Sequence, residues 1–83
     1  MRGMSVTARV SEEARRKSAE TGKTLLSPMM AIEEFDLIAE DPSKLFAELK
    51  RKFGLEPAGK AFSAYIYDRD EIEKVLREAG YLS

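Results

Sequence analysis

The chain has 83 residues, of which 43% are apolar and 35% charged, and its net charge is −1. This length supports one hydrophobic core, so residues 1–83 are expected to form a single domain. The sequence contains neither cysteine nor histidine. Disulfides, thiol or imidazole catalysis, and metal sites built on those side chains are therefore excluded.

The sequence indicates a cytoplasmic protein with no membrane partner. Its first residues lack the apolar stretch of a signal peptide. No apolar run approaches the roughly 20 residues that cross a bilayer. The absence of cysteine also fits a reducing compartment.

Residues 5–10 alternate between apolar and polar side chains, which predicts a short strand. Ser11 then has the character of an N-cap, and two glutamates follow it in the first turn of a predicted helix. This helix is expected to end near Thr21, because Gly22 can adopt the left-handed conformation that follows a helix.

Residues 29–40 fit two patterns. As a helix, they would have Ser27 as N-cap and Pro28 in the first turn. As a strand, they would present alternating apolar residues on one face. A helix here would leave only two strands in the domain, and an isolated two-stranded sheet is marginally stable in water. We therefore predict a strand.

The clearest helix covers residues 42–53. Asp41 is suited to its N-cap, and Pro42 to its first position. Apolar residues recur at helical spacing, and Gly54 can end the helix. The aromatic-rich residues 61–67 predict a strand.

A last helix is predicted to begin with Asp70 as its N-cap and to end at Gly80. The expected order is thus β-α-β-α-β-α, in a small α/β or α+β two-layer sandwich with a three-stranded sheet. Residues 30–67 would form a β-α-β unit with a right-handed crossover. An uncovered sheet edge could pair with a second copy, which makes a homo-oligomer an open alternative.

The sequence favours a protein that is not an enzyme. Its acidic residues lie mainly at helix starts or on helix faces, and adjacent carboxylates in a helix or strand point apart. Asp68, Asp70 and Glu71 come nearest to a metal cluster, but the start of a helix explains them. We expect no metal and no cofactor.

The predicted strand at residues 61–67 suggests a contact surface. Tyr65 and Tyr67 would share an open sheet face, with Lys60 and Arg69 at the strand ends. Stacking rings beside positive charge are typical of single-stranded nucleic-acid binding; alternatively, a helix covers both rings. The basic end of the preceding helix adds positive charge. The predicted contact residues are Lys50, Arg51, Lys52, Lys60, Tyr65, Tyr67 and Arg69.

Two resemblances to known families cover parts of the chain. Residues 60–67 are similar to the third strand of the RNA recognition motif at Lys60, Phe62 and Tyr67. Residues 5–40 resemble a ribbon-helix-helix repressor if residues 29–40 are helical. That resemblance implies a dimer with Arg9 directed at the major groove. No family is assigned from either.

The sequence thus predicts a small, non-catalytic binding module that contacts single-stranded nucleic acid or a ribonucleoprotein surface. The first alternative is a protein–protein adaptor, regulatory subunit or inhibitor that acts through a sheet edge. The second is a dimeric, ribbon-helix-helix-like DNA-binding repressor.

Overall fold

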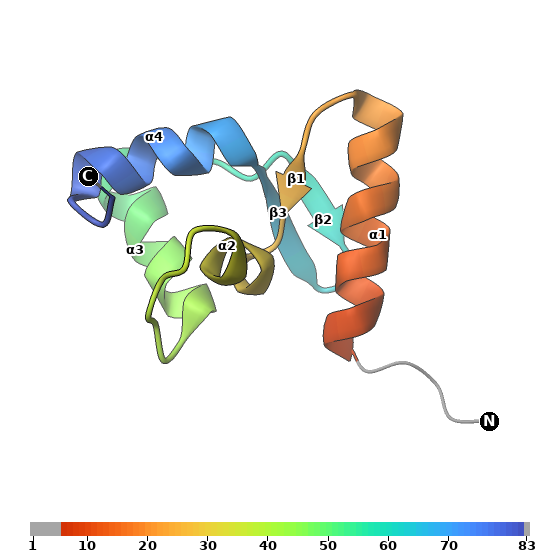
Figure 1. Ribbon diagram of the computed structural model, residues 1–83, viewed down its shortest axis with the longest axis horizontal. Helices are drawn as coiled ribbons and strands as arrows, with labels where there is room; N and C mark the ends of the chain where they lie inside the picture. The colour runs from red at the N-terminus through yellow and green to blue at the C-terminus, as the bar shows by residue number, and fades with distance from the viewer. Residues whose placement is uncertain (1–5, 83) are drawn as a thin grey trace.

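A three-stranded sheet lies between one helix on one face and three helices on the other (Figure 1). The computed structural model describes residues 6–82. The element order is α-β-α-α-β-β-α in a single α+β domain, so the predicted β-α-β-α-β-α order is wrong. The elements are α1 (Val6–Thr21), β1 (Leu25–Leu26), α2 (Pro28–Glu34), α3 (Pro42–Phe53), β2 (Gly59–Ala61), β3 (Ala64–Asp68) and α4 (Arg69–Ala79).

The strand order across the sheet is β1-β3-β2, and both neighbouring pairs are antiparallel. Leu26 is opposite Tyr67, and Ala61 is opposite Ala64. Because both pairings are antiparallel, the predicted right-handed crossover over residues 30–67 does not occur. The chain instead reverses directly between β2 and β3.

The predicted strand at residues 5–10 is wrong, because residues 6–10 are the first turns of α1; Ser5 lies outside the described residues. Val10 and Ala14 are four residues apart, so they share one face of a helix. Both are buried against the sheet. The predicted end of this helix is confirmed, with Gly22 at a φ of +75°.

The helical alternative for residues 29–40 is confirmed in its first half, and the predicted strand is wrong. Ser27 is the N-cap of α2, and its hydroxyl accepts a hydrogen bond from the Met30 N–H. Pro28 occupies the first position of the helix. The sheet still has three strands because Leu25–Leu26 supplies one, and because residues 59–68 form two strands instead of one.

The prediction for α3 is confirmed at both ends. The Asp41 carboxylate accepts a hydrogen bond from the Lys44 N–H, and Gly54 ends the helix at a φ of +73°. Phe46 and Leu49 are buried, which fixes one face of α3 against the sheet and α4.

The final helix begins slightly earlier than predicted. Asp68 is the N-cap of α4, since its carboxylate accepts a hydrogen bond from the Asp70 N–H. Asp70 therefore lies in the first turn instead of capping the helix. The predicted end at Gly80 is confirmed.

Two apolar clusters cover the two faces of the sheet, because successive side chains of a strand point to opposite faces. Leu25 and Ile66 face α1, whereas Leu26 and Tyr67 face the other three helices. The domain therefore has three layers, and the open sheet face of the predicted two-layer sandwich is covered. Beyond Leu26 and Tyr67, the larger cluster includes Ala31, Phe46, Leu49, Leu55, Ile72, Val75 and Leu76.

Candidate functional site

Tyr67 belongs to the core, so the prediction that it lies on an open sheet face is wrong. It is only 5% exposed. The centroid of its ring lies 4.9 Å from that of Phe46, and the two rings are tilted by 52°. Burial raises the pKa of Tyr67, and the charges of Tyr65 and Glu56 add to this shift. The phenol is therefore held in its neutral form.

Tyr65 lies on the same side of β3, but it is 50% exposed. It lies two residues nearer the β2–β3 turn. Lys60 is opposite Tyr65 in the hairpin, and its Nζ lies 5.1 Å from the centroid of the ring. This is a cation–π contact at the surface. The structure thus brings together one ring and one cation of the predicted site.

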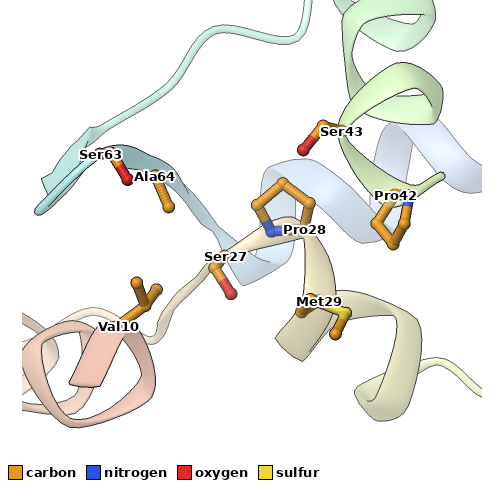
Figure 2. Close-up of a pocket in the computed structure, with 8 residues that line it drawn as sticks. All are labelled: Val10, Ser27, Pro28, Met29, Pro42, Ser43, Ser63 and Ala64. Carbon is orange, nitrogen blue, oxygen red and sulfur yellow. The ribbon is translucent and has the colours of Figure 1, made fainter. Parts of the chain in front are cut away.

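A groove runs between α3 and the β2–β3 hairpin. Figure 2 shows one end of it, a hollow of about 180 Å³ in which Ser63 and Ala64 lie across from Pro28 and Ser43. An adjoining hollow of about 450 Å³ shares these four residues. It continues along α3 and is also lined by Phe46, Ala47, Lys50, Tyr65 and Tyr67. We call the two hollows together the α3–hairpin groove.

Two lysines at the α3–hairpin groove make no ion pair. Lys50 lines the groove, and Lys60 lies over Tyr65. Within residues 6–82, no ion pair involves either lysine. Lys44 lies outside the groove, in a separate hollow that Glu40 and Glu48 also line. Arg51 and Lys52, predicted as contact residues, reach only the Glu48 carboxylate, each at 3.9 Å.

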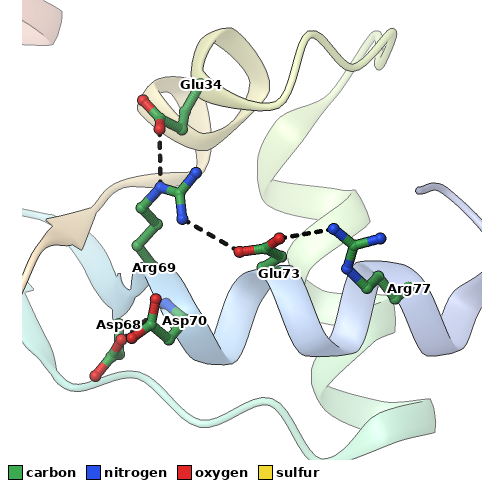
Figure 3. Close-up of polar contacts among 6 residues, drawn as sticks. All are labelled: Glu34, Asp68, Arg69, Asp70, Glu73 and Arg77. Atoms are coloured by element: carbon green, nitrogen blue, oxygen red, sulfur yellow. Dashed lines mark hydrogen bonds and ion pairs between the residues drawn. The ribbon is translucent and has the colours of Figure 1, made fainter. Parts of the chain in front are cut away.

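Arg69, also a predicted contact residue, instead joins α2 to α4 (Figure 3). Its Nε donates to Glu34 Oε2 at 2.8 Å, and its Nη1 donates to Glu73 Oε1 at 3.2 Å. The guanidinium carbon lies 4.9 Å from the centre of the Phe35 ring. The hydrogen bond to Glu34 raises the pKa of Arg69. We therefore assign Arg69 a structural role.

Glu73 accepts hydrogen bonds from two arginines on α4. Its Oε2 accepts from Arg77 Nη2 at 2.8 Å, and its other oxygen accepts from Arg69. The Arg77 hydrogen bond is the main reason that the pKa of Glu73 is lowered. Arg69 and Arg77 thus form ion pairs with carboxylates, whereas the two lysines of the groove do not.

Sequence reasoning missed part of the groove. Ser43 and Ala47 line it from α3, and Ser63 lines it from the turn. The helical spacing of residues 42–53 could have placed the first two on one side of the helix. Nothing indicated the turn, because Phe62–Ser63 lacks the glycine or asparagine that usually marks a two-residue hairpin.

Within residues 6–82, no group of three or more acidic side chains is close enough to hold a metal ion. In the same range, no helix has both the length and the apolar character needed to cross a membrane. Comparisons with protein-family models, curated proteins and solved structures find no match to the chain.

Proposed function

We propose that the chain is a non-catalytic nucleic-acid-binding domain that contacts duplex DNA along the α3–hairpin groove. The observation that carries the proposal is the placement of two lysines without ion pairs at this groove. Lys50 lies on α3 and Lys60 lies on the hairpin, whereas Arg69 and Arg77 form ion pairs with carboxylates. A polyanion is the ligand whose charge complements such a surface.

The order of the elements supports this proposal. A helix-turn-helix unit places two helices in succession and presents the second one to the major groove. α2 and α3 follow that order, and the β2–β3 hairpin comes next in the chain (Figure 1). The turn of this hairpin lies across the groove from Ser43 of α3 (Figure 2). The connection between the helices, residues 35–41, is longer than the usual turn of three or four residues.

The side chains on the exposed part of α3 suit base recognition. In helix-turn-helix proteins, the first residues of the second helix contact base edges. Here these include Ser43 and Ala47, which are short and exposed. A serine hydroxyl can bond to either type of base pair, and an alanine methyl can contact thymine. Lys50 follows on the groove side, where it can bond to guanine or to a phosphate.

Single-stranded nucleic acid is a second candidate, favoured by the exposed Tyr65 ring with Lys60 over it. With Tyr67 in the core, however, the predicted platform loses one of its two rings. The ribbon-helix-helix interpretation loses its strand, because residues 6–10 are helical. An adaptor acting through a sheet edge would have only the two residues of β1 or the three of β2 to pair with.

Fluorescence anisotropy tests the proposal, using duplex DNA, single-stranded DNA and single-stranded RNA of one sequence at low and moderate salt. We expect the tightest binding to the duplex. The logarithm of the affinity should fall with that of the salt concentration, with a slope of about −0.9 for each phosphate neutralised. Preferential binding of either single strand would instead favour the Tyr65 surface.

Lys50→Ala should weaken duplex binding and make the salt slope shallower by about one. The matched control is Lys74→Ala, which removes an exposed lysine from α4, outside the groove. If the protein binds no nucleic acid at low salt, or if both variants weaken binding equally, the groove is not a nucleic-acid interface.

A further inference from the structure

Phe62 occupies an unfavourable backbone conformation at the tip of the β2–β3 hairpin. It is the first residue of the two-residue turn between the paired Ala61 and Ala64, and its φ is +58°. A bulky L-residue seldom adopts positive φ, and glycine is usual at this position of a tight hairpin. Residues in such strained conformations cluster at active sites, ligand clamps and switch regions.

The Phe62 ring is not part of either core cluster. It is 57% exposed and lines a shallow hollow together with residues of α1. The guanidinium carbon of Arg9 lies 5.3 Å from the centre of the ring. Glu12 and Glu13 also line this hollow, but Glu13 is engaged by Arg16. The protein thus presents an apolar ring beside a cation at the tip of a hairpin.

The hairpin tip lies directly beside the α3–hairpin groove. Ser63, the second residue of the turn, lines both hollows of the groove together with Ser43 of α3. A duplex held against α3 would therefore meet the turn that carries Phe62. Lys60, two residues earlier, adds a second cation near this end of the hairpin.

We propose that Phe62 inserts between two base pairs of duplex DNA in the minor groove beside α3 and bends the duplex. This inference rests on the function proposed above. Apolar side chains, phenylalanine among them, are inserted in this way as wedges by proteins that bend DNA, and the duplex kinks toward the major groove, away from the wedge. Insertion should favour pyrimidine–purine steps, because these unstack most readily. The neighbouring Arg9 would contact the phosphates that border the wedge.

The experiment measures binding and bending separately. A duplex of about 30 base pairs carries a donor and an acceptor dye at its two ends, with a TA step at its centre. Bending by the full chain should raise energy transfer at saturating protein. A second duplex carries 2-aminopurine at the central step, and its fluorescence should increase when the base is unstacked.

Phe62→Gly should still bind, with the salt slope of the wild type, but should lose the increases in energy transfer and 2-aminopurine fluorescence. Phe62→Asn is a second variant that also tolerates positive φ, so the test does not depend on one substitution folding. Lys74→Ala is the control, because this lysine is exposed on α4 outside the groove and its removal should change neither the salt slope nor the bending.

The outcomes separate the two proposals. If the wild type binds no duplex, the proposed function fails, and a protein partner for this surface becomes the interpretation to pursue. If the wild type binds without bending the duplex, the proposed insertion of Phe62 is wrong, while the proposed function stands. The proposed insertion is also wrong if both Phe62 variants bend DNA as the wild type does. The ring would then serve only to pack on Arg9.

Discussion

The contact between Tyr67 and Phe46 joins the central strand of the sheet to α3. The two ring centroids lie 4.9 Å apart, and both residues are buried. Since one face of α3 is fixed by this contact, the side that carries Ser43 and Ala47 remains free to line the groove. The core therefore determines which residues of α3 a ligand can reach.

Tyr67→Ala should lower the free energy of unfolding by about 3–5 kcal/mol, because it removes a large buried ring. Tyr65→Ala is the matched control and should change stability by no more than about 0.5 kcal/mol, because Tyr65 is half-exposed. Urea denaturation measures both values. A stable Tyr67→Ala variant that has lost only nucleic-acid binding would contradict the burial of this ring and restore the open-face interpretation.

The raised pKa of Tyr67 predicts a loss of stability at alkaline pH. Burial favours the neutral phenol in the folded state, so this contribution is complete below the ordinary value of 10.0. It is lost as the pH rises through the higher pKa of the folded state. Urea denaturation between neutral pH and pH 11 should therefore show a steeper fall for the wild type than for Tyr67→Phe. An equal fall in both proteins would exclude Tyr67 as the cause.

The helices could be predicted from the sequence where their ends carry strong local signals. α3 has Asp41–Pro42 at one end and Gly54 at the other, and the predicted boundaries are confirmed. The same kind of signal marked the start of α2 at Ser27–Pro28. This local signal conflicts with the expectation that residues 29–40 supply the third strand of the sheet. The two residues of β1 are too few to show a period, so this strand could not be seen.

The candidate site was predictable in its chemistry but not in its exposure. Strand alternation correctly placed Tyr65 and Tyr67 on one side of β3. It could not show that α3 covers the second ring and leaves the first half-exposed. Arg69 was assigned to the site by its place in the sequence. Its partner Glu34 lies 35 residues away, and only the tertiary fold brings the two together.

The lowered pKa of Glu73 predicts a loss of stability in acid. Its charged form is favoured in the folded state, so the contribution is present above the ordinary value of 4.5 and is lost as the pH falls through the lower folded pKa. Glu73→Gln should therefore weaken the dependence of the unfolding midpoint on pH in this range. Glu78→Gln, on the same helix and outside the cluster in Figure 3, is the control. An equal effect of both variants would show that the Glu73 ion pairs are not responsible.

Gly54→Ala should lower the free energy of unfolding by about 1 kcal/mol, because a residue with a Cβ is disfavoured in the left-handed conformation that ends α3. Apart from Gly54 and its two neighbours in the chain, no atom lies within 4 Å of the added Cβ, so the cost arises from the local backbone alone. Gly59→Ala is the matched control: Gly59 is not among the positive-φ residues, and the nearest atom to its added Cβ is Ile66 Cγ1 at 3.8 Å. It should be nearly neutral in thermal denaturation. A larger loss for Gly59→Ala than for Gly54→Ala would mean that packing beside β3, and not the end of α3, limits the stability of this region.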